Sequence, residues 1–341
     1  MSATSERALL RKENLQRLST ESDFFVEGYF EALKDWTFAS TWLELSHAEA
    51  RAITTGRARG LQGLPVAPIL NALAERVDGA IGRVGGCAVV RLSTRSAKDV
   101  VLRRESTADV FLEEDELLKA SGGEDAGRED VRQMIAMMRA AGRAMAARSG
   151  AEALSMFVDS QRVTDDLKEW LQRPEGEGPA MKIVVRQYVR LACELELRAF
   201  IVDRRIAAIS QYYASLVVPR LIREKQAIER RVQEAFATVQ GLVSLEHFVI
   251  DFAIDMEDRL WVVEINLPPP VAGMAMFDRN DPRDREIVQG KGVYEFRIRE
   301  QPPEEDLRRK HQMFFDGAKH RVTTASRGPA SLPKRSLRTS G

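Results

Sequence analysis

Two runs of alternating residues, joined by a short polar turn, constrain the fold of this chain more than any other feature of its sequence. They make up the segment FVIDFAIDMEDRLWVVEINLPPP, residues 248–270. Side chains two apart in a strand face the same way, so one face of each run is apolar and the other carries acids. The segment therefore predicts an antiparallel hairpin that lies with its apolar face on a core.

The turn MEDR sets which residues of this hairpin face each other. A hairpin centred on Glu257 and Asp258 pairs Asp251 with Glu264 and brings Asn266 within one diagonal step of Asp251. The apolar face of the second run is then expected to carry Trp261, Val263 and Ile265. The acidic face is expected to carry Val262, Glu264 and Asn266.

The opposed acids Asp251 and Glu264 need an explanation, because like charges directly opposite each other destabilise a sheet. A divalent cation between them reverses this effect. Together with the Asn266 carbonyl they offer hard oxygen donors that suit magnesium, with coordination positions left for phosphate oxygens and water. The alternative is that the acids simply face solvent. That alternative explains Asp255 and the turn, but Glu264 and Asn266 precede prolines and an apolar stretch typical of a buried segment.

Length and composition limit the class of protein. The 341 residues are enough for two lobes or one large α/β unit, and no apolar run is long enough to span a membrane. The 51 basic and 51 acidic residues balance, which argues against a direct nucleic-acid partner. Cys87 and Cys193 are the only cysteines, so a disulfide framework is not expected and a reducing, cytoplasmic setting fits.

The order of helical and strand patterns predicts an α+β fold, with helices packed on antiparallel sheets. Met134, Met138 and Met145 recur on one face of a helical segment and are expected in the core. The acidic stretch Glu113–Asp130 is expected to be a solvated loop between two helices. We expect four parts: a helical segment over residues 1–60, a lobe with a helical insertion over 61–175, a lobe with the hairpin over 176–315, and a disordered basic tail over 316–341.

The hairpin is similar to the metal-binding strands of ATP-grasp proteins, whose second strand ends in Glu-x-Asn or Asp-x-Asn, as WVVEIN does here. More narrowly, the chain resembles the cell division cycle protein 123 family, an ATP-grasp branch, over roughly residues 29–299. The stretches VVRQYVRLACELELRAFIVDRRIAAISQYY and RLSTRSAKDV carry this resemblance. Arg91 stands where the family has lysine, and Glu264 where it usually has aspartate.

The resemblance implies two α+β lobes that enclose a nucleotide cleft, with ATP and Mg²⁺ as ligands. It implies magnesium at Asp251, Glu264 and Asn266. The residues that it implies for the nucleotide are Arg91, Arg186 and Arg198 at the phosphates, Tyr188 and Val189 at the adenine, and Glu196 at the ribose or an arginine. Alternatively, Arg186 and Arg198 are strand arginines paired with Glu194 or Glu196, and Tyr188 is ordinary sheet packing.

Three functions follow as hypotheses. The resemblance implies an ATP-binding assembly chaperone that helps to join the subunits of eukaryotic translation initiation factor 2 by binding its gamma subunit, as a cytoplasmic monomer. The second hypothesis is a carboxylate-amine ligase of ATP-grasp type, for which the sequence shows no acceptor motif and no identifiable catalytic residue. The third is a scaffold that has lost its nucleotide.

Overall fold

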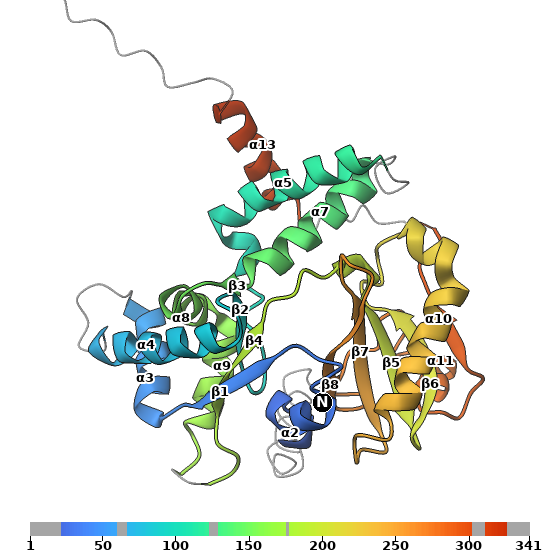
Figure 1. Ribbon diagram of the computed structural model, residues 1–341, viewed down its shortest axis with the longest axis horizontal. Coiled ribbons are helices and arrows are strands. Elements are labelled where there is room, and N and C mark those ends of the chain that lie inside the picture. The colour runs from blue at the N-terminus through green and yellow to red at the C-terminus, as the bar shows by residue number, and fades with distance from the viewer. Residues whose placement is uncertain (1–21, 60–66, 123–128, 175–176, 302–310, 326–341) are drawn as a thin grey trace, which may run out of the picture.

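The computed structural model describes residues 22–59, 67–122, 129–174, 177–301 and 311–325. Two antiparallel sheets lie side by side, and a pair of long helices stands above them (Figure 1). The predicted α+β class with antiparallel sheets is confirmed. Within the described ranges, no helix is both long and apolar enough to cross a membrane.

The first sheet has the strand order β1-β4-β2-β3. Its strands are β1 (Ser40–Glu44), β2 (Ala88–Leu92), β3 (Ala146–Ala147) and β4 (Lys182–Gln187). The helices beside it are α3 (His47–Arg59), α4 (Ala67–Arg83), α8 (Gly150–Asp159) and α9 (Gln161–Trp170). Ile183 and Val185 of β4 join the core under these helices, while Val184 between them joins the other large core.

Two expectations fail in this sheet. The segment 1–60 was expected to be helical, but it supplies strand β1, while its first 21 residues lie outside the described ranges. Strand β4 was expected in the second lobe, but it pairs with β1 and β2. The reason is that alternation along a strand shows which residues are buried but not which sheet the strand joins.

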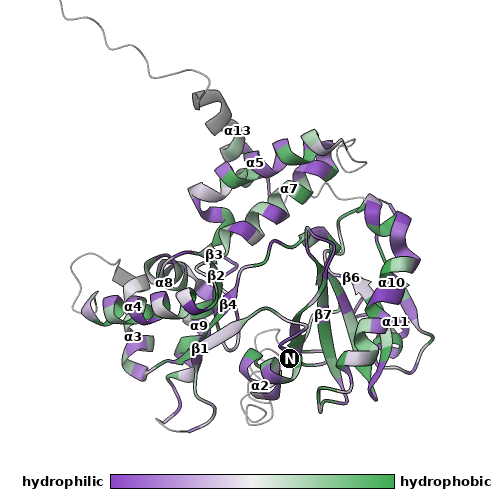
Figure 2. Cartoon of the chain, viewed as in Figure 1, coloured by the Kyte–Doolittle hydropathy of each residue, from purple (hydrophilic) through white to green (hydrophobic). Residues whose placement is uncertain are grey.

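The second sheet has the order β8-β7-β5-β6-β9, with only β6 and β9 parallel. Its strands are β5 (Leu197–Val202), β6 (Arg205–Gln211), β7 (Phe248–Ile254), β8 (Leu260–Asn266) and β9 (Glu295–Arg297). Helix α10 (Pro219–Val239) covers one face and buries Val232 and Phe236 against Phe248. Figure 2 shows β7 largely in the green of apolar residues. Helix α11 (Pro282–Val288) lies near the other face.

The pair of long helices consists of α5 (Glu105–Ser121) and α7 (Glu129–Ala144), with α13 (Gln312–Ala325) against α5. Phe111 of α5 contacts the rings of Phe314 and Phe315.

The expected loop over Glu113–Asp130 is wrong at its start, because α5 continues to Ser121. The expected disorder from residue 316 is also wrong as far as Ala325, because apolar residues dock α13; residues 326–341 lie outside the described ranges.

The remaining short elements join these parts. They are η1 (Ser22–Phe24), α2 (Val26–Leu33), η2 (Val101–Arg103) and η3 (Cys193–Leu195). In Figure 1 helix α2 lies between the two sheets, close to β8. Strand β4 leads through residues 188–192 into η3 and β5, so this connection joins the two sheets directly.

The hairpin of β7 and β8 pairs Asp251 with Glu264 and Val249 with Asn266, as predicted. Nearer the turn the register differs by one residue, because Phe252 pairs with Val262 and Val263 forms a bulge. The bulge also reverses the predicted faces of two residues. Val262 lies in the core with Phe252, and Trp261 lies on the acidic side, where its ring nitrogen binds Asp255.

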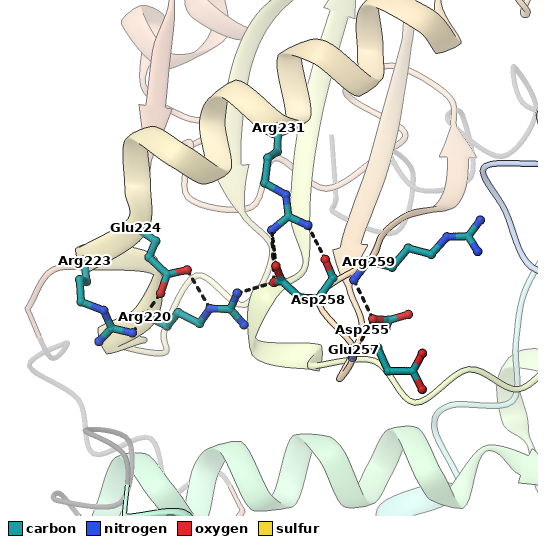
Figure 3. Close-up of polar contacts among 8 residues, drawn as sticks. All are labelled: Arg220, Arg223, Glu224, Arg231, Asp255, Glu257, Asp258 and Arg259. Carbon is teal, nitrogen blue, oxygen red and sulfur yellow. Dashed lines mark hydrogen bonds and ion pairs between the residues drawn. The ribbon is translucent and has the colours of Figure 1, made fainter.

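Asp255 organises the turn of this hairpin rather than facing solvent. Its side chain is 6% exposed and accepts hydrogen bonds from the backbone of Glu257 and Arg259 and from the Trp261 indole, at 2.7–2.9 Å. The next turn residue, Asp258, is held by Arg220 and Arg231 of α10, as Figure 3 shows. Its φ of 67° lies in the left-handed region, which suits aspartate at a tight turn.

We expect Asp255→Ala to lower the free energy of unfolding by about 1–3 kcal/mol, because it leaves the Trp261 indole and two backbone N–H groups without their acceptor. Urea denaturation followed by circular dichroism measures this. Glu257→Ala is the matched control, since its side chain is exposed in the same turn, and should change stability by less than about 0.5 kcal/mol. Equal losses in both variants would contradict the role of Asp255.

Candidate functional site

A cavity of about 430 Å³ lies between the two sheets, and we call it the interlobe cleft. It is lined by β2, by residues 188–191 between β4 and η3, by η2 and α7, and by the bulge of β8. Its size is typical of sites for small ligands. Six of the nine residues singled out from the sequence line it: Arg91, Arg186, Tyr188, Val189, Glu196 and Glu264.

The other three, Arg198, Asp251 and Asn266, do not line the interlobe cleft but lie beside Glu264 on β5, β7 and β8 of the second sheet. Asp251 is fully buried and accepts two hydrogen bonds from Arg198, at 2.8 and 2.7 Å. Arg198 also donates to the Gly273 carbonyl and lies over the Tyr212 ring, 4.8 Å from its centre. The alternative in which Arg198 pairs with Glu194 or Glu196 is wrong, because the antiparallel pairing of β5 with β7 places it opposite Asp251.

The opposed acids are each neutralised by an arginine. Arg91 of β2 donates to Glu264 at 2.8 Å, so this ion pair connects the two sheets. Burial favours a higher pKa for Glu264, but the charge and hydrogen bond of Arg91 outweigh it and lower the pKa to about 2. Burial raises the pKa of Asp251 to about 6, against the opposing effect of Arg198. The two carboxyls therefore differ in their readiness to bind a proton.

The donor set around these acids fits a magnesium ion in part. The Asn266 amide donates to Asp251 at 3.1 Å, so it lies beside the carboxylate that it was predicted to join. Within the described ranges, no group of three or more His, Cys, Asp or Glu residues is placed to hold a metal. An ion here would be bound by the two carboxylates and by oxygens of the ligand, as magnesium commonly is at phosphates. The Asn266 oxygen would take part only if the amide group rotated, because its nitrogen now donates to Asp251.

The Arg186 side chain binds groups of the protein itself. It is 4% exposed and donates to the Val263 carbonyl at the bulge and to the Thr37 hydroxyl, both at 2.7 Å. Its guanidinium also lies over the Phe38 ring. Arg186 therefore fixes the bulge of β8 against β4, and the carboxylate pairs considered for it are not formed: Glu194 binds Arg139 instead.

Lys98 is the cleft residue that the sequence analysis missed. It lines the cleft and remains exposed there, and among the described residues its ammonium has no hydrogen bond or ion pair. Although Lys98 keeps contact with solvent, partial desolvation by the surrounding protein and the nearby charge of Arg162 lower its pKa, while Glu264 and Glu196 oppose this effect. The signal was present, since Lys98 belongs to the AKD sequence within a stretch that carried the family resemblance.

Glu196 faces the same end of the cleft as Lys98. Its carboxylate has no hydrogen bond among the described residues, and burial together with the charges of Asp251 and Glu264 raises its pKa well above the usual range. The polar end of the cleft thus combines one unpaired cation with several acids. Such an end can bind a polyanion only with added positive charge.

The α7 side of the cleft combines apolar surface with paired arginines. Helix α7 contributes Met138 and Gly142, and η2 contributes Val101 and Leu102, while Arg139 and Arg143 of α7 also line the cleft and pair with Glu194 and Glu114. A Cβ at Gly142 would lie 3.1 Å from the Cys193 sulfur, so the close packing of α7 on η3 favours glycine there. Met138 was expected in the core but borders the cleft, whereas Met134 is buried.

Two sheets of mainly antiparallel strands, with a cleft between them and acids on the last hairpin, define an α+β protein. The model of the D123 family matches residues 136–316, just over half of the chain. The chain therefore belongs to the D123 family, and the resemblance to the cell division cycle protein 123 family is confirmed.

Solved structures agree with this assignment at the level of the fold. Cdc123 from Schizosaccharomyces pombe is 14% identical and superposes with a TM-score of 0.57, covering 81% of this chain and 96% of that one. A C-terminally truncated form of the same protein gives the same identity and TM-score over 82% and 98% of the two chains. No curated protein matches the sequence.

Proposed function

We propose that the chain binds ATP with Mg²⁺ in the interlobe cleft. The observation that carries this proposal is the polarity of the cleft. It has apolar surface beside α7, where Arg139 and Arg143 are already paired, while Lys98, which has no partner among the described residues, lies with the acids of the hairpin. An adenine ring would pack on the apolar surface beside Tyr188 and Val189. The phosphates would reach Lys98 and Arg91, since cationic donors offset phosphate charge, while Arg198, which does not line the cleft, would act through Asp251.

Asp251, Glu264 and Asn266 would hold the magnesium ion, which supplies positive charge between their oxygens and those of the phosphates. Arg198 holds Asp251 in place by two hydrogen bonds, and Arg91 does the same for Glu264 by one. Glu196 is free to accept from the ribose. Arg186 acts as a positioning residue, because it fixes the carbonyl of the bulge next to Glu264.

We further propose that the chain is a cytoplasmic, monomeric assembly chaperone that binds the gamma subunit of eukaryotic translation initiation factor 2. Its membership of the D123 family supports this, because that family resemblance implies the role. A carboxylate-amine ligase and a nucleotide-free scaffold are the alternatives that the experiment below separates.

Calorimetric titration of ATP, with and without Mg²⁺, followed by titration of the purified gamma subunit, tests the proposal. We expect magnesium-dependent ATP binding and gamma-subunit binding without ADP release. ADP release stimulated by a carboxylate and an amine would instead support the ligase. A folded protein that binds the subunit but not ATP would be a scaffold, and one that binds neither would overturn both proposals.

Magnesium-dependent ATP affinity should fall as the pH is lowered through about 6. Burial raises the pKa of Asp251 to about 6, so below that pH the carboxyl gains a proton and no longer attracts the ion, whereas Glu264 stays ionised with a pKa of about 2. Titrations between pH 5 and pH 8 measure this. In Asp251→Asn the step near pH 6 should disappear; a step that persists would assign it to another group.

A further inference from the structure

A second cavity, of about 360 Å³, lies on the far side of the Arg91–Glu264 ion pair from the interlobe cleft. Arg91 and Glu264 line both cavities. The walls of the second one come from α2, α9, the loop after β2 and the segment after β8, and we call it the α9 cavity. Its volume lies within the range of small-molecule sites.

The charges that line the α9 cavity are only partly paired. Arg91 binds Glu264 and Arg95 binds Asp166, both at 2.8 Å, so these four groups neutralise each other. Glu169 on α9 and Arg173 just after it also line the cavity and are partly buried.

Within the described ranges, the side chains of Glu169 and Arg173 make no hydrogen bond or ion pair. Partly buried charges without partners are unfavourable. A ligand that carries both signs of charge would relieve both.

Tyr29 adds an independent observation. It lines the α9 cavity and is 3% exposed. The backbone of Ile265 lies close to its hydroxyl, but within the described residues this hydroxyl makes no hydrogen bond of normal geometry. Burial raises the pKa of this hydroxyl, so it stays neutral and can donate. Buried polar groups are nearly always paired, so an unpaired hydroxyl beside a cavity points to a ligand that accepts from it.

We propose that the α9 cavity binds a small molecule with a primary amine and a carboxylate, that is, a free amino acid. Glu169 would bind the ammonium group and Arg173 the carboxylate, while Tyr29 donates a further hydrogen bond. Phe24 and Trp170 give the cavity an apolar surface for a side chain. The α9 cavity borders the proposed nucleotide site, because Arg91, Glu264 and Asn266 line it too, whereas Glu169, Arg173 and Tyr29 do not line the interlobe cleft.

The test is calorimetric titration of each of the standard amino acids into the full chain, with methylamine and acetate as probes that carry one group only. We expect at least one amino acid to bind and neither single-group probe to match it. Glu169→Gln and Arg173→Gln should each weaken binding roughly tenfold or more, because each removes a charged hydrogen bond. Lys168→Gln is the matched control, since Lys168 is exposed on the same helix and does not line the cavity; it should leave affinity unchanged.

ATP titrations on the same variants separate this proposal from the nucleotide proposal. Glu169 and Arg173 do not line the interlobe cleft, so their variants should keep the ATP affinity of the unaltered chain. Amino-acid binding without ATP binding would contradict only the nucleotide proposal. If the folded chain binds no amino acid, or if both cavity variants bind as tightly as the control, the α9 cavity is not an amino-acid site.

Discussion

Replacing Arg198 with methionine is expected to lower the free energy of unfolding by about 3–5 kcal/mol. Asp251 is fully buried, and Arg198 donates both hydrogen bonds of the ion pair between them. Removing one member of a buried ion pair leaves an uncompensated charge, which costs far more than the pair itself contributes. Urea denaturation at pH 7.5 gives the change directly, because two-state unfolding can be checked with two probes.

A double-mutant cycle identifies the cause of that loss. Arg198→Met combined with Asp251→Asn removes the buried charge along with its partner, so the double variant should be more stable than Arg198→Met alone. Arg283→Met provides a control at an exposed ion pair, where the Arg283 side chain is 76% exposed and its partner Glu295 also pairs with Arg297; there the change should stay within about 1 kcal/mol. If the double variant is no more stable than the single one, packing of Arg198 on Tyr212 matters more than its charge.

The sequence was sufficient to predict the hairpin because two independent patterns agreed there. Alternation of side chains separated the acidic face from the core, and the polar turn placed Asp251 opposite Glu264. The predicted pairing of these two acids was correct although the turn is one residue shorter than expected. The extra residue in the bulge at Val263 makes up for the missing turn residue. Alternation alone contains no signal for a bulge, so the faces of Trp261 and Val262 were reversed.

Side-chain partners across the two sheets could not be predicted in the same way. Arg186 looked like a phosphate ligand, but it binds Thr37 and the Val263 carbonyl, which lie 149 and 77 residues away in the sequence. Lys98 was overlooked because one lysine in a loop carries no periodic signal. Such contacts depend on how the sheets lie against each other, and local patterns along one chain do not determine that.

The acid pair itself gives the prediction with the largest functional effect. Asp251→Asn and Glu264→Gln should each weaken magnesium-dependent ATP binding by about 10- to 100-fold, because each removes a charged ligand from an ion that has few protein ligands. Titrations of ATP with and without Mg²⁺ measure the loss, and binding without Mg²⁺ should change little.

Glu264→Asp separates the loss of a magnesium ligand from damage to the fold. It keeps the negative charge and should retain most of the magnesium effect, since both carboxylates bind the ion. Glu257→Gln removes an exposed acid from the turn of the same hairpin and should bind as the unaltered chain does. If Glu264→Gln folds normally and keeps its magnesium dependence, then the opposed acids serve only as anchors for Arg91 and Arg198, and the ion must be held elsewhere in the cleft.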